Sequence, residues 1–181
     1  MRKYLAELLG TMMLVALGTG AVVFAGTSYG PWPIAIGFGI AVIAGIYAFG
    51  SISGGHFNPA ISLAAAINRR ITWREFAGYV VAQIIGAFIG TAVLYGMMLS
   101  FGASNSTIQQ VGFGQTSYSS SLNFFSATLI ELFLTFVFVL VVLMVTSKRN
   151  EKSAAAAPVA IGLILAALIM VGLSSTGGSL N

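Results

Sequence analysis

Residues 53–60 read Ser-Gly-Gly-His-Phe-Asn-Pro-Ala and lie between two long apolar segments. The paired glycines disfavour a regular helix, so the first part of this stretch is predicted to be extended. Asn58 is a favourable helix N-cap, and Pro59 suits the first helical position, where its missing N–H costs no hydrogen bond. A short helix is therefore expected to begin after Asn58 and to end at Asn68, before a pair of arginines.

The composition is that of a membrane protein. The chain has 181 residues, of which 57% are hydrophobic and 7% charged, and its mean hydropathy is +0.96. Five segments reach the length of about 20 apolar residues that a spanning helix requires. We predict an all-α membrane protein with five full spans and one half-helix, in which the first span is retained rather than cleaved as a signal peptide. The predicted spans are residues 4–25, 32–50, 76–101, 124–146 and 154–173.

The basic residues indicate how the chain is oriented. All eight fall in three clusters, which lie before the first span, between the half-helix and the third span, and between the last two spans. The positive-inside rule places these clusters and the N-terminus in the cytoplasm, with the protein in a plasma or inner membrane. The stretch around Asn58 must then enter and leave the membrane from one face. Its helix would cover about 16 Å, or roughly half of the hydrocarbon core.

Three sequence matches, separated by 123 to 125 residues, indicate an internal repeat. Each copy contains an odd number of crossings, so the second copy must be inserted upside down. Inverted-repeat folds place their site near the membrane midplane, between the two copies. The matching elements are Glu7 and Glu131, residues 33–37 and 158–162, and residues 54–58 and 177–181.

The motif at residues 53–60, an early glutamate in the first and fourth spans, and a second Gly-Gly-x-x-Asn resemble the major intrinsic protein family of aquaporins and glycerol facilitators. The resemblance covers the whole chain and implies two half-helices that meet at the midplane, each capped by the asparagine of an Asn-Pro-Ala motif. Asn58 and Asn181 occupy these two positions. Because the second motif stops at Asn181, we expect the chain to be a truncated form of a longer protein. The single transmembrane channel domain 1–181 then comprises repeat one at 1–101, an external loop at 102–123 and an incomplete repeat two at 124–181.

These parts predict a pore for neutral molecules. A helix N-terminus carries roughly half a positive charge, so two that point at one midplane position repel cations, including protonated water. The amides of Asn58 and Asn181 can cap their helices through oxygen and offer N–H donors to a passing water. The extended stretch cannot satisfy its own backbone, so its carbonyls are expected to line the path as acceptors. These carbonyls belong to Gly54, Gly55, His56 and Phe57.

The resemblance also implies a constriction that selects the solute. Three of its four positions, on the second helix, the fifth helix and the second loop, correspond to Phe38, Ile169 and Gly178, and the resemblance implies that the fourth is an arginine shortly after Asn181. A phenylalanine at the position of Phe38 resembles the water-selective branch of the family. That branch, however, usually has a histidine in place of Ile169 and a bulkier residue in place of Gly178. We therefore expect an apolar constriction that is widened by the glycine. Such a constriction would not be selective for water alone and would also pass glycerol, urea or ammonia.

Two intramembrane carboxylates leave a second function class open. In a secondary transporter, Glu7 and Glu131 would bind protons or sodium for coupling. Their repeat-related positions favour a scaffold role, in which each accepts backbone N–H bonds from one extended loop, and the resemblance implies the same role. The leading hypothesis is a passive channel for water and small neutral solutes that excludes protons and ions.

Enzymatic and metal chemistry are not indicated. The chain contains no cysteine, no aspartate and a single histidine, His56, so we expect no metal site, no cofactor and no nucleophile–base pair. The expected partners are the permeating solutes and the lipid bilayer, without nucleic acid. The resemblance implies a homotetramer with one pore per subunit. The spacing of Gly86 and Gly90 predicts a close contact between two helices.

Overall fold

The structure is a computed structural model that describes residues 1–26 and 29–181, without the side chain of residue 151. Within the described residues, five helical segments are long and apolar enough to cross a membrane, which confirms the predicted all-α architecture. The helices are α1 (Arg2–Ala21) with the π-helical turn η1 (Val22–Gly26), α3 (Pro31–Ser53), α4 (Pro59–Ile67), α5 (Trp73–Ser100), α6 (Asn105–Val111), α7 (Phe124–Val145), the 3₁₀ segment η2 (Lys148–Ala156) and α8 (Ala157–Gly172).

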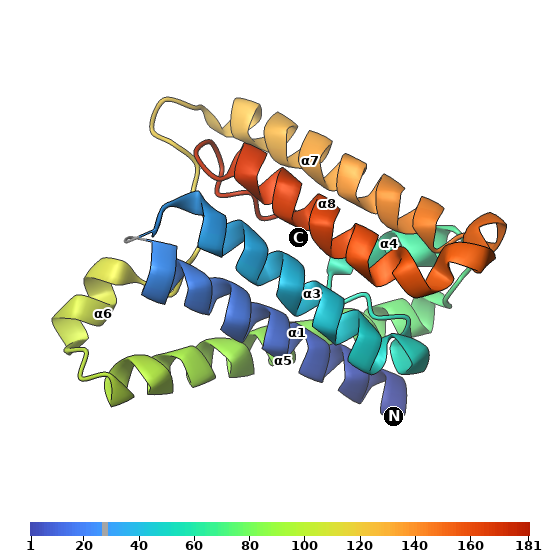
Figure 1. The fold of residues 1–181 in the computed structure, drawn as a ribbon, viewed down its shortest axis with the longest axis horizontal. Coiled ribbons are helices and arrows are strands. Elements are labelled where there is room, and N and C mark those ends of the chain that lie inside the picture. Colours follow the sequence, from blue (N-terminus) through green and yellow to red (C-terminus); the bar gives the residue numbers. More distant parts are fainter. Residues whose placement is uncertain (27–28) are drawn as a thin grey trace.

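The long helices run side by side in one bundle (Figure 1). Helix α3 packs against α1 on one side and α8 on the other, α7 covers the outer side of α8, and α5 covers α1. The half-helix α4 fills the space between α5 and α7. The chain ends at Asn181 near the middle of the bundle, level with the start of α4 in this view.

Local sequence signals set the helix boundaries. Helix α3 continues to Ser53, beyond the predicted end, because Gly54 takes the left-handed C-cap conformation with φ 96°. Helix α5 starts earlier than predicted because Thr72 and Glu75 form a reciprocal capping box. The predicted half-helix is confirmed, with Asn58 as its N-cap.

The short α-helix α6 is not predicted by the sequence patterns. Helix α6 lies within residues 102–123, where the serine- and glycine-rich composition indicates a loop. The Ser104 hydroxyl caps its start by accepting a hydrogen bond from the backbone N–H of Thr107, at 3.2 Å. Gly112, with φ 68°, ends it. A helix of two turns leaves too short a pattern to distinguish it from a loop by composition.

Glycines allow the helices to approach closely. A Cβ atom at Gly90 would lie 2.6 Å from the carbonyl oxygen of Met12, and one at Gly86 would overlap the carbonyl oxygen of Leu8. The predicted helix contact at Gly86 and Gly90 is therefore confirmed, and its partner is α1. Gly39 likewise allows α3 and α8 to approach closely, since a Cβ atom added there would lie 2.7 Å from a carbonyl oxygen of α8.

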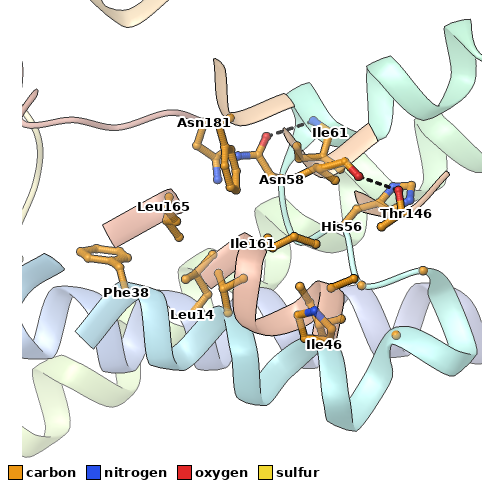
Figure 2. A pocket seen from close by; sticks show the side chains of 18 of the residues that line it. Leu14, Phe38, Ile46, His56, Asn58, Ile61, Thr146, Ile161, Leu165 and Asn181 are labelled. Atoms are coloured by element: carbon orange, nitrogen blue, oxygen red, sulfur yellow. Dashed lines mark hydrogen bonds between the residues drawn. The ribbon is translucent and has the colours of Figure 1, made fainter. Parts of the chain in front are cut away.

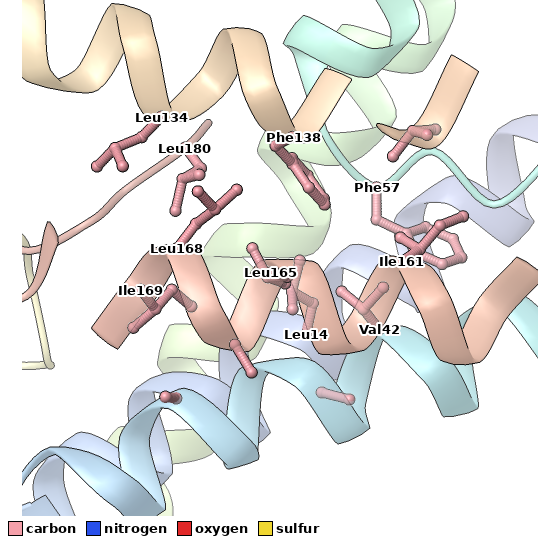
Figure 3. Close-up of a cluster of buried hydrophobic side chains, with 14 of the residues drawn as sticks. Leu14, Val42, Phe57, Leu134, Phe138, Ile161, Leu165, Leu168, Ile169 and Leu180 are labelled. Carbon is pink, nitrogen blue, oxygen red and sulfur yellow. The ribbon is translucent and has the colours of Figure 1, made fainter. Parts of the chain in front are cut away.

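The largest apolar cluster is formed by α1, α3, α4, α7 and α8 together with one residue from each Gly-Gly-x-x-Asn segment. Figure 3 shows these two residues, Phe57 and Leu180, among the helix side chains. Both are essentially fully buried. The two segments are thus anchored in the core by apolar side chains as well as by polar contacts.

Candidate pore

The two Gly-Gly-x-x-Asn segments have nearly the same backbone conformation. In each, both glycines and the residue before the asparagine take a positive φ. The glycines do so at little steric cost, whereas a bulky residue in this region costs on the order of 1–2 kcal/mol and must be held there by its surroundings. The φ values are 96°, 66° and 49° for Gly54, Gly55 and Phe57, and 88°, 62° and 51° for Gly177, Gly178 and Leu180.

Glu7 holds the first segment. Its side chain is fully buried, and each carboxylate oxygen accepts two hydrogen bonds. Oε1 accepts from the Ser53 hydroxyl at 2.6 Å and from the backbone N–H of His56 at 3.0 Å. Oε2 accepts from the backbone N–H of Phe57 at 2.7 Å and from the Gln83 amide at 2.8 Å. The carboxylate thus binds two consecutive backbone N–H groups at the positive-φ turn.

Glu131 makes the matching contacts to the second segment. It accepts hydrogen bonds from the backbone N–H groups of Ser179, at 3.1 Å, and Leu180, at 3.0 Å. The Thr176 hydroxyl donates to it, as the Ser53 hydroxyl does to the first glutamate. The environment is less enclosed, since Glu131 is only partly buried. The two copies of the inverted repeat therefore share the same pattern of individual hydrogen bonds.

The polar side chains that assist the glutamates were outside the predicted site. A hydroxyl residue precedes each Gly-Gly pair, Ser53 in one copy and Thr176 in the other, which is a signal visible in the sequence. Gln83 is a polar side chain within an otherwise apolar span, and its amide bridges Glu7 and the Ser62 hydroxyl. A buried amide of this kind requires hydrogen-bond partners, so its position could have indicated the network.

Asn58 connects the half-helix to the second segment. Its side-chain oxygen accepts from the backbone N–H groups of Ala60, at 2.7 Å, and Ile61, at 3.3 Å, and so caps α4. Its side-chain nitrogen donates to the carbonyl oxygen of Leu180 at 2.7 Å. The amide has two N–H groups, so one remains for another acceptor. Figure 2 shows the Asn58 and Asn181 side chains close together.

A cavity of about 1590 Å³ borders both asparagines. Its walls extend from Lys3 and Lys148, at the basic end of the bundle, to residues 114–117, in the loop at the other end. In Figure 2, apolar side chains that include Leu14 and Phe38 lie opposite the asparagines. The cavity therefore passes along the bundle, and near its middle the polar asparagines lie opposite apolar side chains.

Most of the predicted site residues line this cavity, but three do not. The Phe57 ring is turned into the core by its positive φ, and the residue is not part of the cavity wall. Glu7 and Glu131 lie behind the wall, where they bind the two segments. The predicted residues that line the cavity are Phe38, Gly54, Gly55, His56, Asn58, Ile169, Gly178 and Asn181.

Gly178 does not widen the cavity in the way expected from the sequence. A Cβ atom there would lie 3.2 Å from the Ile169 Cα and 3.4 Å from its carbonyl oxygen, so it would point at α8 and not into the open space. The glycine instead allows the segment to pack closely on the helix. Gly55 has the same role in the first repeat, with a Cβ position 3.2 Å from Ile46 Cγ1.

The loop at residues 102–123 also reaches the cavity. Residues 114–117 line its wall, and a Cβ atom at Gly177 would lie 2.8 Å from Thr116 Cβ. The Ser119 backbone N–H donates to the Ser175 carbonyl at 2.8 Å. These contacts fix the loop against the second Gly-Gly segment. They were not predicted, because a serine-rich loop carries no pattern that specifies its tertiary contacts.

Comparisons with known proteins match essentially the whole chain to members of one family. The family model described as Major intrinsic protein matches residues 1–181. Glycerol uptake facilitator protein-like 6 of Lactiplantibacillus plantarum is 46% identical, and the match covers 100% of this chain and 80% of that protein. Aquaporin Z of Photorhabdus laumondii is 37% identical with the same two coverages, 100% and 80%. The crystal structure of the aquaglyceroporin from Plasmodium falciparum is similar with a TM-score of 0.90 at 31% identity, covering 99% of this chain and 76% of that chain.

Proposed function

The chain belongs to the major intrinsic protein family, and we propose that it is a passive channel through which water and small neutral solutes cross the membrane down their gradients. The observation that carries this proposal is the cavity that runs along the bundle past Asn58 and Asn181. The placement of Glu7 and Glu131 behind the cavity wall supports a scaffold role for both carboxylates and disfavours ion coupling through them.

Exclusion of ions follows from the electrostatics of the wall. Helix α4 begins directly after its N-cap Asn58, so the helix N-terminus brings roughly half a positive charge to the middle of the path. Opposite the asparagines, the side chains of Leu14 and Phe38 are apolar and offer a cation no ligands. A neutral solute needs only the donor of the Asn58 amide and the carbonyls that we assign to Gly54, Gly55 and His56, which line the cavity.

We assign the constriction to Phe38, Ile169 and the backbone of Gly178. Both side chains are apolar, so neither offers a strongly hydrated ion a group that could replace its water shell. It also accommodates the carbon chain of a small polyol. Relatives named Aquaporin Z support water as a solute, and relatives named glycerol uptake facilitator and aquaglyceroporin support glycerol as a second solute.

Swelling measurements on proteoliposomes test this function. Purified protein in lipid vesicles is expected to accelerate the volume change after an osmotic step, and to accelerate reswelling when glycerol is supplied outside. The rates should not change when a protonophore and a sodium ionophore collapse ion gradients. Rates equal to those of empty vesicles would falsify the channel, and gradient-dependent uptake would favour the transporter alternative.

We propose that the basic end of the bundle, including the N-terminus, faces the cytoplasm. Lys3 is paired with Glu75 at the start of α5, and Arg70 donates to the Leu143 carbonyl at the end of α7 at 2.9 Å, which supports one common end for the basic clusters. Because the chain has no cysteine, single exposed cysteines can report the topology. In intact cells, Ser120→Cys is expected to react with a membrane-impermeant maleimide, whereas Ser153→Cys should react only after lysis. The reverse pattern would refute this orientation.

We also propose that the protein is a homotetramer in the bilayer with one pore per subunit, as the family resemblance implies. The outward surfaces of α5 and α7 carry exposed large apolar side chains such as Phe88 and Phe133, which require lipid or another subunit as a neighbour. Light scattering in detergent, corrected for bound detergent, is expected to give the mass of four chains. A monomer mass under several mild detergents would contradict the assembly.

A further inference from the structure

On the face of α1 that borders the cavity, the residue at position 18 does not contribute to the cavity wall. Leu14 and Val22 line the cavity, and Gly18 lies midway between them at a spacing of four residues, which places all three on one side of the helix. Gly18 itself is buried and is not part of the cavity wall. The cavity wall near this level includes Phe38 of α3, whose ring lies against Gly18, together with Val15 and Thr19 of α1.

The Phe38 ring rests directly on the backbone of α1. A Cβ atom added to Gly18 would overlap Cδ1 and Cε1 of the ring and would lie 2.7 Å from its Cγ. All three of these nearest atoms belong to the Phe38 side chain. The ring therefore occupies space that any residue other than glycine would fill.

From this contact we infer that Gly18 is a positioning residue that sets the width of the solute path. It provides a recess in α1 into which the Phe38 ring withdraws, so the opening depends on the residue at position 18 as well as on Phe38. This inference rests on the proposed function, in which Phe38 forms part of the constriction.

The direction in which the ring would move follows from its surroundings. An ordinary contact between a methyl group and a ring carbon is about 3.5–4 Å, so a side chain at position 18 must displace the ring by on the order of 1 Å. The ring lies against α1, packs against the buried apolar cluster and borders the open space of the cavity. A displaced ring therefore enters the path and narrows it.

Gly18 differs from the glycines that serve helix packing. At Gly86 and Gly90 of α5, and at Gly39 of α3, the nearest atom to an added Cβ is a backbone carbonyl oxygen of another helix. A substitution at those positions separates helices. At Gly18 it meets one side chain, which has rotamer freedom and open space beside it.

The test compares glycerol and water permeability in proteoliposomes. In Gly18→Ala, glycerol permeability per protein is expected to fall on the order of tenfold, and water permeability by a clearly smaller factor, because the larger solute fills more of the opening. The matched control is Gly20→Ala on the same helix, where an added Cβ would meet only Leu94 Cδ1 at 3.9 Å. This control should equal the wild type for both solutes.

A double substitution separates the ring contact from general damage. In a Phe38→Leu background, Gly18→Ala is expected to have no further effect on the ratio of glycerol to water permeability. If Gly18→Ala fails to fold, recovery of folding and conduction in the double variant would support the ring contact, and failure to recover would refute it. An equal loss for both solutes in both backgrounds, or a Gly18→Ala channel identical to the Gly20→Ala control, would also overturn the inference. Failure of the wild type to conduct would instead count against the proposed function.

Discussion

Glu7→Gln is expected to abolish water permeability and to lower the thermal stability of the protein at the same time. The carboxylate accepts four hydrogen bonds, two at each oxygen, whereas the glutamine amide keeps one oxygen and replaces the other with a donor. The Ser53 hydroxyl and the Gln83 amide can reorient, but the backbone N–H groups of His56 and Phe57 cannot. At least one of these N–H groups must then face another donor while buried.

The expected loss is large because Glu7 accepts the hydrogen bonds of both backbone N–H groups at the strained turn, those of His56 and Phe57. Each buried donor without a partner costs about 1–3 kcal/mol, so one or two of them cost about 1–6 kcal/mol. Once the turn at Phe57 relaxes, the neighbouring Asn58 loses its position in the path. Thermal unfolding in detergent and vesicle swelling should both report the change.

A matched control removes the same charge from an ion pair at the surface of the bundle. Glu75→Gln disrupts a solvent-screened ion pair with Lys3 and part of a helix cap, which contribute little to stability at the surface, and it should conduct normally. Glu131→Gln should fall between the two, because that carboxylate is only partly buried. A Glu7→Gln protein with normal thermal stability but no solute uptake would support ion coupling in place of the scaffold role.

Much of the fold was predictable because a bilayer permits few alternatives. Unsatisfied backbone groups are costly in hydrocarbon, so long apolar segments must be helices, and their lengths give the number of spans. The half-helix could be placed because Asn58 and Pro59 are strong local signals that act within a few residues. The repeat then related Glu7 to Glu131 without any knowledge of how the helices pack.

The contacts that shape the path were not predictable in the same way. In a soluble helix an apolar stripe marks the buried face, but here both the lipid and the interior are apolar, so the spans show no such stripe. The sequence alone could not indicate that Gly18 faces Phe38, or that the missing Cβ of Gly178 points at α8. Both facts depend on helix rotation, which is set by close packing at positions such as Gly39 and Gly86.

Asn58→Asp is expected to weaken proton exclusion while leaving α4 capped. An aspartate oxygen can still accept from the N–H groups of Ala60 and Ile61, and a carboxylate is favourable at a helix N-terminus. The donor to the Leu180 carbonyl is lost, however, and a carboxylate oxygen now faces that carbonyl oxygen. The link between the two segments should break, and water permeability should fall.

The change of charge acts on the barrier itself. A charge near a helix terminus in a partly buried site interacts with it by up to about 2 kcal/mol, so cancelling the positive end of α4 should raise proton leak by about tenfold or more. A pH-sensitive dye trapped in the vesicles measures this leak. The control is Asn68→Asp, which makes the same change at the exposed opposite end of the same half-helix and should leave proton leak unchanged. Equal leak in the two variants would mean that the N-terminal charge of α4 is not the barrier, and that exclusion depends on the constriction at Phe38 and Ile169.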